Sequence, residues 1–349
     1  TRRIITSVRV WIARLPHNLV IVNLISNLAL AAIMGSATAQ MAVMSRVVVP
    51  EMERDGYDRG YAASLTASAG LLGPIIPPSM LLIIYGVIAQ VSIAEMFMAG
   101  IVPGIALFVL ILVLAFWQAT RNHKQQGGTE RLNLSQKIAA TIPGLAAMLI
   151  PLVIVGGISF GVFTPTESAA AAIVVALVFA VLEFKGQTFR RIVPIIDRTV
   201  ANSAIVLFLI VAAKIFGWVL TFNQVPQHVA AFIVSLTDDP TIFLLLIVVF
   251  LFIVGMFLDG IAALIILTPI LLPVAISQYG IDPIQFGLIL AMTLVLGLLT
   301  PPVGTGLYIA AALSKVSVMR LSKLVLPYVA ATLAVILAVV FIPWMVHPF

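Results

Sequence analysis

Two apolar segments of the chain are interrupted by glycine and proline residues that would leave polar backbone groups exposed in nonpolar surroundings. The first interruption is Gly73-Pro74-Ile75-Ile76-Pro77-Pro78, and the second is Thr300-Pro301-Pro302-Val303-Gly304-Thr305-Gly306. Proline lacks a backbone donor and clashes with the preceding helical turn, so carbonyl groups beside it have no helical partner. Such carbonyls can coordinate Na⁺, and the hydroxyls of Ser79, Thr300 and Thr305 add further oxygens. The helices that follow would present their positive N-terminal ends to an anion.

The segments beside each interruption are too short to cross a membrane alone. Residues 62–72 and 79–89 flank the first, and arms of 11 residues rise roughly 16 Å as helix, about half of a bilayer core. Irregular backbone at that depth must be surrounded by protein or water. We therefore predict two re-entrant hairpins, at 61–90 and 284–313. The alternative is that proline and glycine only kink two ordinary spanning helices.

Two further helix breaks are predicted within apolar runs. Gly35-Ser36-Ala37-Thr38 forms one, and Gly255-Met256-Phe257-Leu258-Asp259-Gly260 the other. A carboxylate between apolar runs is a functional candidate, so Asp259 could ligate a cation or accept a proton. It could equally cap the helix that starts near Ile261. Both roles stay open.

Composition places these segments in a polytopic, all-α membrane protein. The chain has 349 residues, of which 62% are hydrophobic and 9% charged, far from the roughly 25% charged residues of soluble domains. Hydrophobic runs predict spans at 17–34, 96–118, 138–158, 166–183, 199–220, 241–257, 261–277 and 322–346. The net charge of +6 fits cytoplasmic loops and requires no nucleic-acid partner. Without cysteine or a His-Glu-x-x-His pair, no catalytic nucleophile or metal cage is visible, so we expect no enzyme activity.

Loop charges predict an orientation for the chain. The loops at 119–137 and 184–198 are rich in Lys and Arg, which places them in the cytoplasm. The segment 221–240 has no Lys or Arg and is expected outside. The basic start of the chain, and the lack of a partner for span 199–220 in the first half, suggest an upstream span.

An internal repeat relates the two halves at an offset of 224 residues. The matched pairs are Gly56 and Gly280, Asp58 and Asp282, Pro77-Pro78 and Pro301-Pro302, and Pro103 and Pro327. We expect inverted repeats, a plan typical of secondary transporters with a central site. The predicted parts are a first repeat over 1–118, connecting spans over 119–198 and a second repeat over 199–349. An ion channel is the rival, but it predicts a continuous pore with rings of charge.

Several strings resemble the large membrane subunit of tripartite ATP-independent periplasmic (TRAP) transporters, in order along essentially the whole chain. They are Gly56-Tyr57-Asp58-Arg59-Gly60, Gly73-Pro74-Ile75-Ile76-Pro77-Pro78-Ser79, Phe163-Thr164-Pro165-Thr166-Glu167-Ser168, Leu267-Thr268-Pro269-Ile270-Leu271-Leu272-Pro273, Gly280-Ile281-Asp282-Pro283 and Leu299-Thr300-Pro301-Pro302-Val303-Gly304. The resemblance implies a Na⁺-coupled importer in a bacterial inner membrane. It also implies a small membrane subunit, a periplasmic substrate-binding protein and an elevator motion of a hairpin-bearing domain.

The resemblance also implies site residues and a class of substrate. The implied substrate residues are Ser36, Thr38, Pro77, Pro78, Ser79 and Thr305. The implied Na⁺ residues are Ser36, Gly73, Pro74, Asp259, Thr300, Pro301, Val303 and Gly304. The expected cargo is a small organic anion such as a C4-dicarboxylate, with sialic acid or another sugar acid as the alternative.

Overall fold

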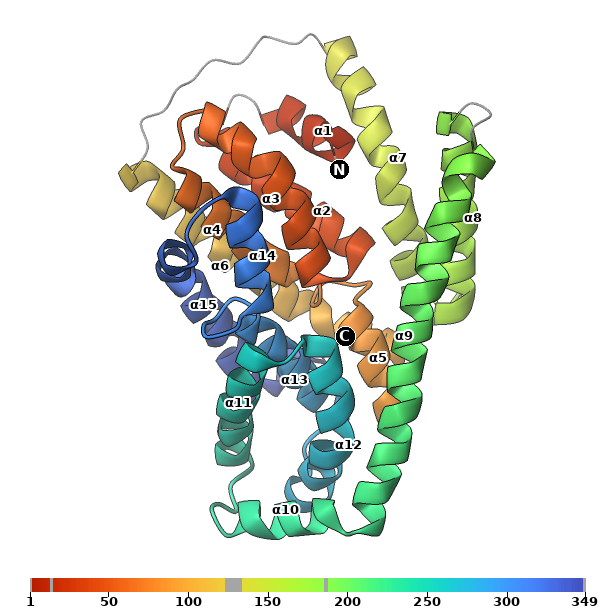
Figure 1. Cartoon of the computed structure of the whole chain (residues 1–349), viewed down its shortest axis with the longest axis vertical. Coiled ribbons are helices and arrows are strands. Elements are labelled where there is room, and N and C mark those ends of the chain that lie inside the picture. The colour runs from red at the N-terminus through yellow and green to blue at the C-terminus, as the bar shows by residue number, and fades with distance from the viewer. Residues whose placement is uncertain (1, 13–14, 123–133, 185–187, 348–349) are drawn as a thin grey trace.

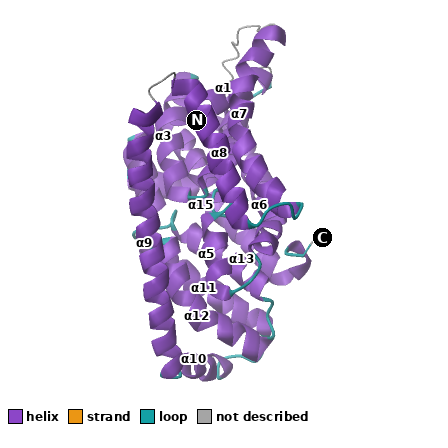
Figure 2. Cartoon of the chain, turned by 90° about the vertical axis from the view of Figure 1, so that its right-hand side faces the viewer, coloured by secondary structure: helices purple, strands orange, loops and turns teal. Residues whose placement is uncertain are grey.

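The computed structural model describes the chain except for residues 1, 13–14, 123–133, 185–187 and 348–349, and its described residues form helices without any strand (Figures 1 and 2). The α-helices are α1 (Arg2–Ile12), α2 (Asn18–Met34), α3 (Ala37–Arg54), α4 (Arg59–Ala69), α5 (Met80–Ala89), α6 (Ile93–Asn122), α7 (Leu134–Ser159), α8 (Pro165–Phe184), α9 (Thr188–Phe222), α10 (Val225–Val234), α11 (Pro240–Phe257), α12 (Gly260–Tyr279), α13 (Pro283–Gly297), α14 (Thr305–Ser314) and α15 (Val318–Phe341). Short 3₁₀ turns lie at η1 (Gly70–Leu72) and η2 (Pro343–Met345). Each predicted span has a helix.

Five helices are long and apolar enough to cross a membrane. They contain the stretches Ile93–Thr120, Ile192–Leu220, Pro240–Phe257, Gly260–Tyr279 and Val318–Phe341. A bilayer core needs about 20 apolar residues in a helix, and these stretches approach or exceed that length. The fold is therefore that of a multi-pass, all-α membrane protein, as the composition predicts.

The internal repeat is present in the backbone. Asp58 caps α4 and Asp282 caps α13, each accepting the amide of the residue three positions later, at 2.9 and 2.8 Å. The matched pairs Pro77-Pro78 and Pro301-Pro302 both have cis peptide bonds. Short polar caps and left-handed glycines end helices for steric reasons, so matched punctuation yields matched helices.

Each half contains a hairpin, but not where the sequence places it. Tyr57, just beyond α3, lies 3.4 Å through its hydroxyl from His17 Nδ1, just before α2. In the second half, Phe243 of α11 stacks on Tyr279 of α12 with ring centroids 4.3 Å apart. Each pair of helices thus starts and finishes at one end of the molecule. We call α2–α3 the first hairpin and α11–α12 the second hairpin.

The proline-interrupted segments instead run through the molecule. Along α15, Arg320 binds Asp58 at 2.8 Å and Gln285 binds the Val339 carbonyl at 2.9 Å. Because α15 has 24 residues, or roughly 36 Å of helix, the starts of α4 and α13 lie at opposite ends of the molecule.

The far ends of the interrupted segments complete this geometry. Arg59 Nε donates to the Ser314 carbonyl at 2.6 Å, and the Tyr85 hydroxyl donates to the Pro283 carbonyl at 2.6 Å. Thus α14 ends where α4 begins, and α5 ends beside the start of α13. The predicted re-entrant hairpins at 61–90 and 284–313 are wrong, and the alternative of kinked spanning helices is nearer the structure. We call α4–η1–α5 and α13–α14 the first and second interrupted helices.

The reason for the error is local. Pro and Gly end a helix, but they do not dictate whether the chain turns back or continues in line. At the first interruption the turn Gly70–Ile76 keeps 3₁₀ and α-turn bonds, with the Ile76 amide on the Leu72 carbonyl at 2.8 Å. Here the chain continues, whereas the two residues between α2 and α3 reverse it.

The two halves exchange elements around a central core. Helix α14 packs on α3 of the first half, and α5 packs on α12 of the second. Every residue of α13 from Ile284 to Gly297 is buried, so this helix forms the centre (Figure 1). The last helices of the halves end at opposite ends: the Tyr61 hydroxyl binds the Ala115 carbonyl of α6 at 2.7 Å near the start of α4, whereas α15 ends near α13. The halves are therefore inverted.

Charge differs between the two ends. Arg54, Arg59, Lys315, Arg320 and Lys323 lie at the end where α4 begins. At the other end, the described segments 86–96, 222–240, 279–285 and 342–347 contain no Lys or Arg. This asymmetry supports the predicted orientation, with the basic end in the cytoplasm. Residues 123–133 and 185–187 of the two predicted basic loops lie outside the described residues.

Candidate functional site

The two hairpin tips meet the first interruption at one small pocket inside the molecule. The pocket is lined by Gly35, Ser36, Ala37, Thr38, Pro74, Met80, Leu81, Asp259, Gly260, Ile261 and Leu298. It offers about 40 Å³ to particles the size of water. That volume suits an ion or a few waters, whereas a carboxylic acid of four carbons would require the tips to move apart.

Backbone geometry holds the first tip against the first interruption. Gly35 ends α2 with a φ of +57°, and a Cβ there would lie 3.1 Å from the Pro78 carbonyl oxygen and 3.2 Å from the Met80 amide nitrogen. Only glycine combines the left-handed conformation with this close approach. Ser36 then caps α3 by accepting the Ala39 amide at 3.5 Å, and its hydroxyl lies 3.3 Å from that of Thr38.

Asp259 is the carboxylate of the pocket. It caps α12 by accepting the Ile261 amide at 3.0 Å, and its side chain is exposed. One carboxylate oxygen therefore serves the cap, and the side chain still reaches the pocket. The capping role is confirmed, and the exposed carboxylate leaves cation binding as a prediction.

Three helix N-termini converge on this pocket. Ala37 begins α3, Met80 begins α5 and Gly260 begins α12, and all three line it. Each N-terminus carries roughly half a positive charge. The pocket therefore combines positive helix ends, which attract an anion, with the carboxylate of Asp259 and hydroxyl oxygens, which attract a cation.

The structure brings together some predicted residues and separates others. Ser36, Thr38, Pro74 and Asp259 line the pocket. Pro78 touches it through its carbonyl near Gly35. Pro77 and Ser79 are buried, and the Ser79 hydroxyl donates to the Pro74 carbonyl while accepting the Leu82 amide at 3.3 Å. Ser79 thus closes the first interruption rather than facing the pocket.

The second interruption stands beside the pocket and contributes Leu298 to it. The Gly304 amide donates to the Met256 carbonyl at 3.0 Å, which ties this interruption to the second hairpin. Thr300 binds the Leu296 carbonyl of its own helix at 3.2 Å. The Thr305 hydroxyl is buried without a hydrogen-bond partner, so it is an available ligand. The backbone of Pro301 and Val303 is in the exposed part of this turn.

Sequence reasoning missed Gln40. This side chain is fully buried in α3, one turn beyond Ser36, and its Oε1 has no partner. A Cβ on Gly73 would lie 2.6 Å from that oxygen, which places it against the first interruption. The available signal was an amide spaced four residues after a predicted break, a spacing that puts both side chains on one helix face.

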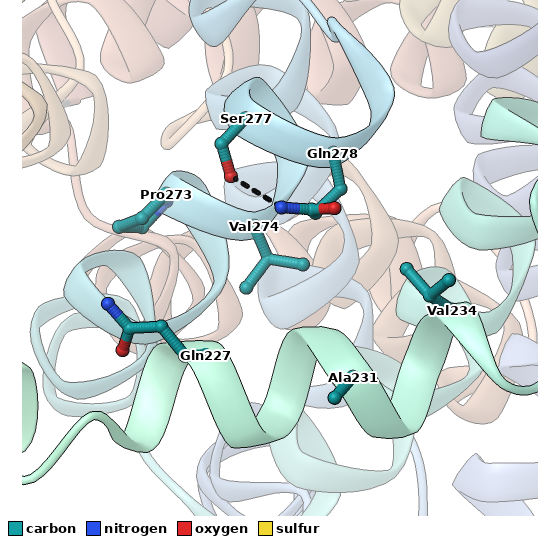
Figure 3. A pocket seen from close by; sticks show the side chains of 7 residues that line it. All are labelled: Gln227, Ala231, Val234, Pro273, Val274, Ser277 and Gln278. Carbon is teal, nitrogen blue, oxygen red and sulfur yellow. Dashed lines mark hydrogen bonds between the residues drawn. The ribbon is translucent and has the colours of Figure 1, made fainter.

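A larger cavity lies at the end without basic residues, between α10 and α12 (Figure 3). It measures about 300 Å³ and is lined by Gln227, Ala231, Val234, Pro273, Val274, Ser277 and Gln278. Ser277 and Gln278 bind each other at 3.4 Å. None of its lining residues is charged, and none was predicted as a site residue.

The Phe163–Ser168 string forms a helix start, as its pattern predicts. The carboxylate of Glu167 accepts the Thr164 amide and hydroxyl, each at 2.8 Å, and the Thr164 hydroxyl accepts the Glu167 amide at 3.3 Å. This is a reciprocal capping box. The backbone hydrogen bond from Thr164 lowers the pKa of Glu167 most, and the hydroxyl bond adds to it. The motif is structural and distant from the pocket.

Comparison with known proteins gives the family. A family model described as "Tripartite ATP-independent periplasmic transporter, DctM component" matches residues 1–345. The chain is 34% identical to the "Isethionate TRAP transporter permease protein DctMQ" of Oleidesulfovibrio alaskensis over 98% of its own length and 54% of that protein. It is 33% identical to the "2,3-diketo-L-gulonate TRAP transporter large permease protein YiaN" of Escherichia coli, over 98% of the chain and 80% of the relative.

A third relative is the "Sialic acid TRAP transporter large permease protein SiaM" of Vibrio cholerae, 31% identical over 97% of the chain and 79% of the relative. The chain thus spans about half of the first relative and about four-fifths of the other two. The match to the family model covers nearly all of the chain, and the family is one of transporter permeases rather than enzymes. The chain belongs to the DctM component family of tripartite ATP-independent periplasmic transporters.

Proposed function

We propose that this chain is the membrane subunit of a Na⁺-coupled secondary importer of small organic anions in a bacterial inner membrane. The observation that carries the proposal is the pocket where Ser36, Asp259 and three helix N-termini meet. An organic acid needs positive groups at its carboxylate, and Na⁺ needs oxygens beside it. Both kinds of group lie on the same hairpin tips, so binding of one changes the field felt by the other.

Na⁺ binding is proposed at the tips and at the interruptions. The ligands would be hydroxyls and backbone carbonyls of Ser36, Gly73 and Pro74 on one side, with Asp259 on the other. Thr300, Pro301, Val303, Gly304 and Thr305 would supply a second set at the second interruption, where the Thr305 hydroxyl is unpaired. A bound cation would neutralise Asp259 and leave the helix N-termini free to hold the anion.

We propose an elevator motion for transport. Hairpins and interrupted helices interlock, with α14 packed on α3 and α5 on α12, so they can move as one body. Helix α9 packs on this body through Gly217 against Pro269 of α12, and most of its other described side chains are exposed. A smooth, small contact of this kind permits sliding, whereas interdigitated cores resist it.

The cargo and partners follow from chemistry and from the relatives. Relatives are named for isethionate, 2,3-diketo-L-gulonate and sialic acid, all organic anions. We propose a C4-dicarboxylate or similar small carboxylate, with sialic acid or another sugar acid as the alternative. A small membrane subunit and a periplasmic substrate-binding protein would complete the transporter; the first relative is a DctMQ protein.

Uptake into proteoliposomes tests the proposal. We expect the complete complex to accumulate a labelled organic acid only with an inward Na⁺ gradient and the cognate binding protein. Uptake that continues undiminished in Na⁺-free buffer with a proton gradient would contradict Na⁺ coupling. Thermal shifts of the binding protein against dicarboxylates and sugar acids would identify the cargo, because the cognate acid stabilises it by mass action.

A further inference from the structure

The interior of the first hairpin contains a row of buried polar side chains. Asn23 and Asn27 lie on α2, Gln40 on α3 and Thr66 on α4, and all four are fully buried. Uncompensated polar groups in such surroundings are costly. A row of four therefore needs either complete internal pairing or a ligand.

The row is a one-way relay of hydrogen bonds. Gln40 Nε2 donates to Asn27 Oδ1 at 2.9 Å, and Asn27 Nδ2 donates to Asn23 Oδ1 at 2.7 Å. Asn23 Nδ2 donates to the Thr66 hydroxyl at 2.8 Å, which in turn donates to the Ala62 carbonyl at 2.7 Å. Successive bonds in one direction polarise each other, so negative charge accumulates on the first amide oxygen of the chain.

That first oxygen is Gln40 Oε1, and it has no hydrogen-bond partner. The orientation of the amide is determined by its surroundings, because Nε2 lies between the Asn27 backbone and side-chain oxygens at 2.8 and 2.9 Å. Oε1 therefore points the other way, towards Gly73. A Cβ on Gly73 would lie 2.6 Å from Oε1 and 3.5 Å from the Ser36 carbonyl carbon. The free oxygen thus faces the place where the first tip meets the first interruption.

The second hairpin has no such row. The positions 224 residues later are Ile247, Leu251, Leu264 and Leu290. They pair one by one with the four relay residues, and all are apolar and buried. The hairpin fold therefore does not require a polar interior, so the relay must serve something present only in the first half.

We propose that Gln40 Oε1 is an oxygen ligand of the cation held at the first hairpin tip, and that Asn27 and Asn23 position it. The inference rests on the proposed Na⁺ coupling. A buried, unpaired amide oxygen raises the free energy of the empty site, and a bound cation would remove that penalty. Because the amide is neutral, it adds a ligand without opposing the anion at the neighbouring helix N-termini.

The test compares Na⁺ titrations of uptake by the complete complex in proteoliposomes. Gln40→Met preserves length and volume but removes the oxygen, so we expect the Na⁺ concentration for half-maximal uptake to rise about tenfold, the effect of losing one good contact. Gln40→Glu keeps an oxygen and should hold half-saturation at or below the wild-type value. The matched control is Leu264→Met at the equivalent position of the second half, which should leave it unchanged.

Na⁺-dependent thermal stabilisation of the complex in detergent gives a second readout. We expect wild type and Gln40→Glu to gain stability with Na⁺ relative to choline, and Gln40→Met to gain little. If Gln40→Met does not assemble, Gln40→Asn keeps the amide but withdraws its oxygen, and it should raise half-saturation in the same direction. Equal titrations for wild type and the variant lacking the oxygen, or equal losses in Gln40→Met and Gln40→Glu, would refute the ligand role alone. Wild-type uptake that ignores Na⁺ would instead refute the proposed coupling.

Discussion

The first and second hairpins have the same backbone plan but opposite interiors. Both pair two helices of 17 to 20 residues and end in a polar N-cap at the tip, Ser36 in one and Asp259 in the other. The first encloses the relay from Gln40 to Thr66, whereas the second encloses leucine and isoleucine. Inversion symmetry therefore constrains the path of the chain and leaves side-chain chemistry free to diverge.

The difference also shows how each half supplies polar groups to the centre. In the first half they extend from the tip into the buried interior; in the second they are concentrated at the exposed carboxylate of Asp259. A neutral buried ligand and an exposed charged ligand hold a cation by different means. The first depends on packing and hydrogen-bond orientation, and the second on Coulomb attraction that salt screens.

Exchanging residues between the hairpins should have the largest effect. Asn27→Leu removes the donor to Asn23 Oδ1 and one acceptor of Gln40 Nε2, so we expect a loss of about 2–4 kcal/mol in the free energy of unfolding. Leu251→Asn, the reverse change, buries an amide among apolar side chains and should lose a similar amount, about 2–4 kcal/mol. Unfolding in mixed micelles measures both.

The combined variant Asn23→Ile/Asn27→Leu/Gln40→Leu sharpens the same comparison. It copies the apolar interior of the second hairpin, and replacing all partners of a polar network can be nearly neutral. We expect much of the stability lost in Asn27→Leu to return while Na⁺ dependence stays weak. Recovery of both properties together would show that the relay has only a structural role.

Equivalent glycines should differ in the order of their effects. Gly73 and Gly297 are 224 residues apart, yet a Cβ on Gly297 would lie 2.3 Å from the backbone of Gly255, whereas one on Gly73 meets the end of the Gln40 side chain at 2.6 Å. Backbone cannot yield as a side chain can, so Gly297→Ala should destabilise by about 3 kcal/mol and Gly73→Ala by about 1 kcal/mol. Thermal unfolding would contradict this if the order reversed.

Asp259 allows its two roles to be separated. Asn is as good an N-cap as Asp, so Asp259→Asn should leave stability unchanged while weakening the dependence of uptake on Na⁺. Asp259→Ala loses the cap as well and should cost about 1 kcal/mol. A Na⁺ titration of Asp259→Asn that overlays the wild type would leave capping as its role.

The smallest effect is expected at the cytoplasmic end. Arg320 and Asp58 pair at 2.8 Å with side chains 58% and 41% exposed, so Arg320→Ala should change stability by less than about 1 kcal/mol. The effect should shrink in high salt. A larger loss that persists in molar salt would indicate that this pair does more than join surface segments.

Sequence reasoning located the important residues better than it described their arrangement. Matched prolines and Asp58 and Asp282 identified the repeat because local steric rules act wherever these residues occur. The same rules could not say which break reverses the chain. That depends on contacts such as Tyr57 with His17 and Arg59 with Ser314, which join residues far apart in the sequence.

The sequence by itself determined the membrane class, the helices, their breaks, the orientation of charge and the family, because each follows from composition, short-range sterics or motif order. Tertiary structure decided which helices fold back and which continue, that Ser79 closes an interruption, and that Gln40 turns a free oxygen towards Gly73. The physical reason is that a hydrogen bond or a cavity belongs to groups brought together by packing, and no single segment contains it.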